Sequence, residues 1–316
     1  MRLWILALAF VATSAAAQNT RVLMDTDRGP ILVELDRTRA PNTVANFLSY
    51  VDDGTYNNTL IHRVVSNFVV QGGAFKDNVA TVTRRAAINS ERNNGLLNTP
   101  GTLAMALSGN PPNVNSATTD FFFNTGTNTS LNANFTVFGR MIFGTKVLAD
   151  INSLPVIGGT EQPVRIPLVR RMVRVTPGEF PILPLHTGAW FDPANSGKGF
   201  LLEVARIDGV EGNPQMLVAW YDFHEGRQIW MNGIASFPYG ASSVEVPLQI
   251  STGGQFGAAF NPSQVTTNSN WGRITIRFTS CDAGTFTYTT AFGNGTVPVR
   301  SLTLPTNEAC AANKVP

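Results

Sequence analysis

The residues best suited to chemistry lie in one short run, Leu60–Gly73, with the sequence LIHRVVSNFVVQGG. Two apolar, β-branched stretches flank a Ser-Asn pair, a pattern that predicts two strands joined by a tight turn. Arg63 lies inside the first stretch, and a cation in an apolar strand is costly unless it faces a cleft or a partner. Gln71 lies in the second stretch. Gly72 and Gly73 then allow a sharp turn or a close approach to another backbone.

Three further motifs follow in order: GTLAMA at residues 101–106, NSATTDFFFN at 115–124, and FTVFGR at 135–140. Together with the first run they resemble the cyclophilins, a family of peptidyl-prolyl cis/trans isomerases whose signature is close to Phe-His-Arg-Val-Ile-x-x-Phe-x-x-Gln-Gly-Gly. Ile61 replaces the first Phe of that signature. An ordinary hairpin with one buried Arg is the alternative for the first run alone. Four motifs in family order favour the resemblance, which covers roughly residues 20–175.

The resemblance implies a mainly β fold, a closed eight-stranded antiparallel barrel with a helix over each open end. The sequence supplies these elements in the same order. Alternating apolar residues predict a hairpin over 20–36, and a helix follows from Pro41 to Gly54. A second helix is predicted at Thr145–Asn152, and Val169–Val175 would be the last strand.

The resemblance also implies the chemistry. An X–Pro amide resists rotation by about 18–20 kcal/mol because the nitrogen lone pair is delocalised. The family role of Arg63 is to donate hydrogen bonds near the prolyl nitrogen, which favours the twisted state over either planar one. Gln71 would hold substrate backbone groups beside it. Arg63 and Gln71 are therefore the predicted catalytic residues, and no cofactor or metal is expected because no nucleophile or proton transfer is needed.

A further set of residues would bind the substrate, mostly by forming an apolar pocket for the proline ring. The predicted members are Phe68, Met105, Ala106, Asp120, Phe122, Leu131 and Phe135. A single aromatic residue of this kind would ordinarily belong to the barrel core. Their occurrence together with Arg63 and Gln71 favours the site.

Several positions depart from the family pattern. Asp120 replaces a Gln, can accept but not donate a hydrogen bond, and could pair with Arg63. Ser130 stands where many members have an aromatic wall, and Phe135 where many carry His or Tyr. His62 is expected to be structural, because isomerisation needs no base. These changes bear on rate and substrate preference more than on fold.

The chain of 316 residues is long enough for two domains. Its net charge is +2, 14% of its residues are charged, and it has no long basic run of the kind typical of nucleic-acid binding. Residues 1–17 carry Arg2, an apolar run and an Ala-x-Ala site, which predicts a secretory signal peptide cleaved after Ala17. A membrane anchor is the alternative, but the apolar run is too short to span a bilayer. We expect a periplasmic or secreted protein, a monomer without a membrane span.

The predicted isomerase domain ends near Val175, giving domains at 18–176 and 185–316 with a proline-punctuated linker at 177–184. Short β-branched and aromatic runs separated by Gly, Pro, Asn or Asp predict an all-β sandwich or small barrel after the linker. The opening of this half, around Trp190 and Phe200, resembles an uncharacterised module of secreted bacterial proteins. That resemblance supplies no activity, and the ligand of the module is unknown.

Cys281 and Cys310 are the only cysteines. In an exported protein a disulfide is the default expectation, and chain entropy gives about 3–4 kcal/mol for a loop of this length. Two unrelated thiols are the alternative.

Two functions from different classes follow. The first is an exported isomerase acting on X–Pro bonds in unfolded or loop segments, thereby assisting protein folding. The second is a catalytically weak cyclophilin-like binding protein whose C-terminal β module carries the main partner interaction. Arg63 and Gln71 favour the first, whereas Asp120 and Ser130 favour the second.

Overall fold

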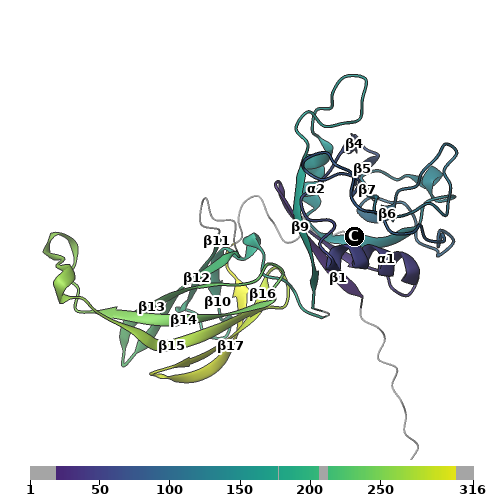
Figure 1. Cartoon of the computed structure of the whole chain (residues 1–316). Coiled ribbons are helices and arrows are strands. Elements are labelled where there is room, and N and C mark those ends of the chain that lie inside the picture. The colour runs from purple at the N-terminus through teal and green to yellow at the C-terminus, as the bar shows by residue number, and fades with distance from the viewer. Residues whose placement is uncertain (1–18, 177, 206–212, 304–316) are drawn as a thin grey trace, which may run out of the picture.

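A computed structural model describes residues 19–176, 178–205 and 213–303 (Figure 1). It contains two β units, each with its own hydrophobic core. The predicted signal peptide and Cys310 lie outside the described residues. No helix within those ranges is long and apolar enough to cross a bilayer.

The first unit is a nine-stranded antiparallel sheet in the order β3-β9-β1-β2-β8-β6-β7-β5-β4. Its strands are β1 (Thr20–Thr26), β2 (Gly29–Leu35), β3 (Thr59–Leu60), β4 (Arg63–Val65), β5 (Val69–Gly72), β6 (Thr102–Met105), β7 (Phe121–Asn124), β8 (Val137–Phe143) and β9 (Leu168–Val175). The two edge strands, β3 and β4, are separated in the chain only by Ile61 and His62. The sheet therefore curls so that Ile61 and His62 connect its two edge strands. It has nine strands and not the expected eight, because the chain at this point forms two separate strands, β3 and β4.

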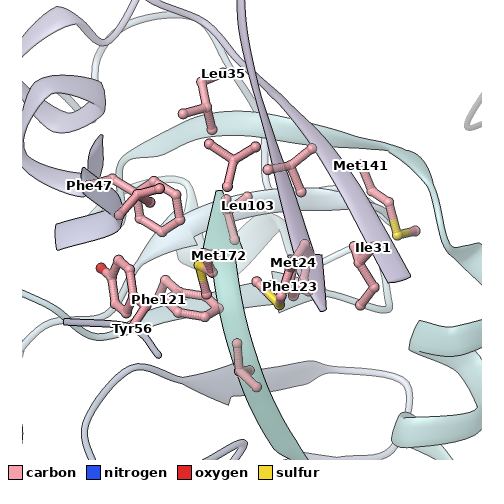
Figure 2. Close-up of a cluster of buried hydrophobic side chains, with 14 of the residues drawn as sticks. Met24, Ile31, Leu35, Phe47, Tyr56, Leu103, Phe121, Phe123, Met141 and Met172 are labelled. Atoms are coloured by element: carbon pink, nitrogen blue, oxygen red, sulfur yellow. The ribbon is translucent and has the colours of Figure 1, made fainter. Parts of the chain in front are cut away.

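Two helices flank this sheet as predicted, α1 (Pro41–Asp52) and α2 (Thr145–Asn152). Pro41 occupies the first turn of α1, where its missing N–H costs nothing. Gly54 follows the helix with a φ of +73°, the left-handed conformation that commonly ends a helix. Phe47 points from α1 into the core, where its ring packs near Tyr56 and Phe121 (Figure 2).

The second unit is a closed eight-stranded barrel in which each strand pairs with the next and β10 pairs with β17. Its strands are β10 (Gly188–Phe191), β11 (Gly199–Ala205), β12 (Gln215–His224), β13 (Arg227–Ser236), β14 (Ser243–Thr252), β15 (Thr266–Phe278), β16 (Ala283–Thr290) and β17 (Gly293–Ser301). Short 3-10 turns occur in both units. In the first unit lies η1 (Thr129–Leu131), before the second barrel lies η2 (Pro184–His186), and within that barrel lie η3 (Gly257–Ala259) and η4 (Pro262–Gln264). The small barrel is therefore the correct alternative, and the sandwich is wrong.

The two barrels share a smaller apolar cluster. Leu23 and Leu32, on the outer faces of β1 and β2, pack with Leu183 and Leu185 from the segment that joins the barrels. Cys281 of the second barrel, also buried, belongs to the same cluster. The segment between the barrels thus contributes buried side chains, and β1 is buried on both faces because its outer face is covered here.

Polar contacts border this cluster. The carboxylate of Glu179 accepts hydrogen bonds from Ser242 and Arg277, which lower its pKa. Arg171 of β9 stacks over the ring of Tyr239 with 4.6 Å from its guanidinium carbon to the ring centroid. Charged and aromatic groups therefore join the barrels around an apolar centre.

Candidate active site

One row of residues crosses four neighbouring strands of the first sheet. Arg63 of β4 lies opposite Gln71 of β5, Gln71 lies opposite Phe122 of β7, and Phe122 lies opposite Ala104 of β6. Directly opposed residues of antiparallel strands point to the same face. The fold therefore places a cation, an amide and an aromatic ring in sequence on one face of the sheet.

The guanidinium of Arg63 is fixed by two partners. Nη1 donates to the Gln71 side-chain oxygen at 3.1 Å, and Nε donates to the carboxylate of Glu161. Nη2 makes no hydrogen bond to another described residue. With 32% of the Arg63 side chain exposed, this third nitrogen is available to a substrate.

An apolar cluster continues the face beyond Gln71. Phe122 forms its buried floor with Val69, Ala104 and Val137, and other side chains pack against this floor while remaining partly exposed. The predicted site residues among these are Phe68, Ala106, Leu131 and Phe135. The rings of Phe122 and Phe135 meet edge to face at 5.6 Å, which is a favourable aromatic geometry. A surface of this kind can hold a proline ring beside the guanidinium.

Met105 does not belong to this surface, and the prediction that it lines the pocket is wrong. Its side chain is fully buried in the barrel core. Neighbouring residues of a strand face opposite sides. Since Ala104 and Ala106 face the apolar cluster, Met105 must face the interior. Val69, which the sequence analysis missed, contributes to the floor instead.

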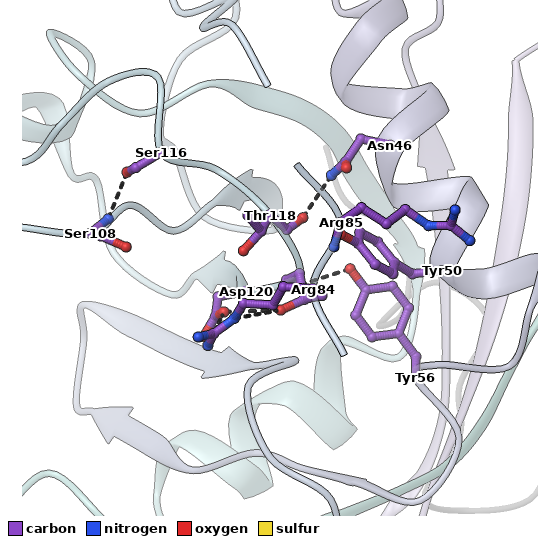
Figure 3. Close-up of polar contacts among 10 residues, drawn as sticks. Asn46, Tyr50, Tyr56, Arg84, Arg85, Ser108, Ser116, Thr118 and Asp120 are labelled. Atoms are coloured by element: carbon purple, nitrogen blue, oxygen red, sulfur yellow. Dashed lines mark hydrogen bonds and ion pairs between the residues drawn. The ribbon is translucent and has the colours of Figure 1, made fainter. Parts of the chain in front are cut away.

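Asp120 does not pair with Arg63, contrary to the possibility raised by the sequence. Its carboxylate accepts from Nη2 of Arg84 at 3.0 Å and from the hydroxyl of Thr119 at 3.1 Å (Figure 3). A buried hydrogen bond also fixes the adjoining backbone, because the Tyr56 hydroxyl donates to the Thr119 carbonyl oxygen at 2.7 Å. Burial raises the pKa of Tyr56 well above its usual value, so its donor proton is retained. Asp120 therefore forms a separate ion pair.

A buried asparagine network supports the apolar surface. The amide of Asn128 donates to the Phe68 carbonyl at 2.7 Å and to the Asn124 side-chain oxygen at 2.7 Å. Asn124 in turn donates to Asn98, which anchors Asn132 beside η1. The network ties the turn before β5 to the turn that carries Leu131. No motif in the sequence analysis identified it.

The glycines and the histidine of the signature act as scaffold. Gly73 has a φ of +90°, and a Cβ there would lie 2.6 Å from the Thr119 carbonyl oxygen, so only glycine fits. This confirms the predicted close approach. Burial lowers the pKa of His62, and its ring meets Phe75 edge on at 5.1 Å. His62 is thus held neutral against an aromatic neighbour, as a structural residue would be.

A hollow of about 400 Å³ lies elsewhere on this barrel, beside α2, lined by Asn124, Thr125, Thr145 and Leu148 among others. It contains none of the predicted catalytic or substrate-binding residues. We assign the site to the row at Arg63, because there the predicted donor, Gln71 and a partly exposed apolar surface lie together. Within the described ranges, no three His, Cys, Asp or Glu side chains gather where they could hold a metal ion.

Comparison with known proteins agrees with this geometry. The sequence profile of the family described as cyclophilin type peptidyl-prolyl cis-trans isomerase/CLD matches residues 21–172. A peptidyl-prolyl cis-trans isomerase of Acinetobacter baylyi is 44% identical over 145 residues, covering 44% of this chain and 76% of the relative. Peptidyl-prolyl cis-trans isomerase B of Escherichia coli is 38% identical over 141 residues, covering 42% and 84%.

Among solved structures, a cyclophilin type peptidyl-prolyl cis-trans isomerase of Cryptosporidium parvum aligns with 50% of this chain and 98% of its own, at a TM-score of 0.44 and 23% identity. The family profile ends before the second barrel begins. The sequence relatives and the row of Arg63, Gln71 and Phe122 lead to one conclusion. This chain belongs to the cyclophilin-type peptidyl-prolyl cis-trans isomerase family.

Proposed function

We propose that the protein is an exported peptidyl-prolyl isomerase that acts on X–Pro bonds in unfolded or loop segments and so assists protein folding. The observation that carries this proposal is the position of the Arg63 guanidinium at the end of the apolar surface formed by Phe68, Phe122 and Phe135. The names of its relatives support the same reaction.

The arrangement explains catalysis without a covalent step. A proline ring on the apolar surface places the prolyl nitrogen near the free Nη2 of Arg63. As the amide twists, the nitrogen lone pair localises and becomes a better hydrogen-bond acceptor. A fixed donor then stabilises the twisted state more than the planar ones. Gln71 keeps the donor in place and offers its amide N–H groups to the substrate backbone.

Arg63→Ala is the direct test of this role. We expect kcat/KM for a short Ala-Pro peptide to fall on the order of 10²–10³-fold, by analogy with the loss of one transition-state donor. A protease-coupled assay on the mature full-length chain measures it. Arg273→Ala is the matched control, because Arg273 lies on the second barrel in an exposed pair with Glu245. An unchanged rate in folded Arg63→Ala protein would sink the assignment.

Export rests on the N-terminal pattern, an Arg followed by an apolar run and three alanines before Gln18. N-terminal sequencing of protein recovered from a periplasmic or culture fraction should begin at Gln18. In the same material, thiol titration without reductant should detect no free thiol if Cys281 and Cys310 are bonded. Intact Met1 on protein that stays in the cytoplasm would contradict the export proposal.

A binding protein with little turnover is the second candidate, and two observations favour it. Ser130 is exposed on η1 and leaves the surface beside Leu131 without an aromatic wall. The outer surface of β11, β12 and β13 also exposes six large apolar side chains, a feature of interaction surfaces. They are Leu201, Leu217, Tyr221, Phe223, Trp230 and Ile234. A wild-type rate no higher than that of Arg63→Ala would select this candidate.

A further inference from the structure

The loop between α2 and β9 folds into a small hairpin that reaches Arg63. Its two arms are joined by hydrogen bonds from Ile157 to Gln162 and from Val164 to Pro155, each at 2.9 Å. Gly158 and Gly159 form the turn, with Gly159 at a φ of +77°. Glu161 is docked directly on β4, because its carbonyl oxygen accepts from the Val64 N–H at 2.8 Å. This backbone bond fixes where the Glu161 side chain begins.

The carboxylate of Glu161 then accepts from Nε of Arg63, while Gln71 accepts from Nη1. Two of the three guanidinium nitrogens are occupied, and the plane of the group is set by two acceptors. Nη2 alone has no hydrogen-bond partner among the described residues. We propose that Glu161 is a positioning residue for the isomerase reaction, holding the Arg63 guanidinium so that Nη2 is presented to the prolyl nitrogen.

The exposure of the pair argues against a role in stability. The Glu161 side chain is 53% exposed and that of Arg63 is 32% exposed. An ion pair in contact with water adds only about 0–1 kcal/mol to folding. Orientation of a planar, charge-assisted donor is a different effect, because it removes rotamer freedom before the substrate binds.

The geometry also argues against inhibition. A carboxylate that blocked the substrate would need to occupy Nη2, whereas Glu161 accepts from Nε and makes no hydrogen bond to Nη2. Asp120, the other nearby acid, is already paired with Arg84. Glu161 therefore supports the donor and does not compete for it. This inference rests on the proposed isomerase function.

The experiment compares wild type, Glu161→Gln and Glu161→Ala in the same peptide assay. We expect kcat/KM to fall on the order of tenfold in Glu161→Ala, below the 10²-fold that a displacement of about 1 Å can cost. Glu161→Gln should lose less, because its side-chain oxygen can still accept from Nε. The loss should appear in kcat measured by exchange NMR at saturating peptide, with little change in KM. Glu245→Gln, which removes a more exposed Arg–Glu pair on the second barrel, is the control.

A second measurement does not depend on activity. In wild type the Arg63 Nε–H should give a protected NMR signal, which Glu161→Ala should broaden or lose. Glu161→Ala should also have no further effect on the rate in an Arg63→Ala background, since it acts only through that side chain. A rise in activity, an unchanged rate, or an equal loss in both backgrounds overturns the proposal. An inactive wild type instead overturns the isomerase function.

Discussion

Arg63 and Asp120 carry opposite charges on the same part of the barrel, yet each is neutralised by another residue. Arg63 is paired with Glu161, and Asp120 with Arg84. The charges of Asp120, Arg63 and Arg84 all act on His62, so the two pairs lie close together. The site consequently contains a fixed cation without an unpaired anion beside it.

Asp120→Asn should therefore leave the reaction itself nearly intact. We expect kcat/KM for an uncharged peptide to change less than about fivefold, the range that an exposed ion pair of about 0–1 kcal/mol allows. The unpaired Arg84 should instead raise the relative rate for a peptide with Glu before the proline. Asp53→Asn is the control, because it removes the neighbouring exposed pair with Arg85. A gain above tenfold on the uncharged peptide would mean that Asp120 competes for Arg63 after all.

Individual residues were predictable where a strand fixes their direction. Arg63, Gln71 and Phe122 were found because the signature specifies both their type and their spacing. Met105 was misassigned although the alternation of a strand separates it from Ala104 and Ala106. Glu161 could not be found, since it lies in a loop without a motif and meets Arg63 only through the fold.

The turns around the site are joined by side-chain amides and not by regular secondary structure. Asn128 is buried in the segment that leads to η1 and reaches back to the Phe68 carbonyl. The same carbonyl accepts from the Thr125 N–H at 2.9 Å. Two donors thus fix the backbone of an aromatic residue in the site, so the network should affect both stability and rate.

Asn128→Ala tests this coupling. It removes a donor to Phe68 and leaves the Asn124 side-chain oxygen without that partner, which should cost about 1–3 kcal/mol of unfolding free energy. Isomerase activity at a temperature where the variant is folded should also fall. Thr127→Ala, at the exposed neighbouring position, is the control. Normal activity and urea stability in Asn128→Ala would show that the network is dispensable.

Strands and helices with clear periodicity were predicted closely, including α2 at identical bounds. In the second barrel, the sequence marks β10 and β17 only weakly as strands. The strand β10 has only four residues, and β17 contains Gly293, Gly295 and Pro298, which read as loop. Those two strands are the pair that closes the barrel, so the choice between sandwich and barrel stayed open. The asparagine network was missed because asparagine is common in any loop.

The two barrels are joined by packed apolar side chains as well as by the connecting segment. Leu23, Leu32 and Phe143 of the first barrel would be exposed in a fragment ending at residue 176. Their outward position could be read from the sequence, because Leu23 and Leu32 interrupt the alternation of their strands. The predicted domain bounds remain a prediction, but the buried contacts mean that the stability of one barrel depends partly on the other.

His186 makes the stability of the second barrel depend on pH. Its ring is fully buried and stacks on Phe278 at 3.6 Å, and burial lowers its pKa to about 3. In the unfolded chain a histidine titrates near about 6.5. The stability that depends on neutral His186 is therefore fully present above about pH 6.5. As the pH falls toward about 3, the free energy of unfolding decreases by up to ~1.4 kcal/mol per pH unit.

Urea unfolding followed by tryptophan fluorescence measures this dependence. Every tryptophan after the predicted signal peptide lies in the second barrel, so the signal reports on that barrel. The midpoint should fall between pH 7 and pH 5 in wild type and much less in His186→Gln. The comparison uses the slope with pH, so a uniformly less stable variant remains informative. His224→Gln, at a more exposed histidine, should keep the wild-type slope, and an equal slope in His186→Gln would contradict the prediction.

In each unit the first strand of the sequence pairs with the last. Arg21 of β1 pairs with Val175 of β9, and Trp190 of β10 pairs with Ser301 of β17. Neither sheet can therefore be completed while its last strand is still inside the ribosome, and such long-range pairing is slow to form. For a polypeptide that we propose to be exported, this delay in pairing favours an unfolded chain during passage through a translocation channel.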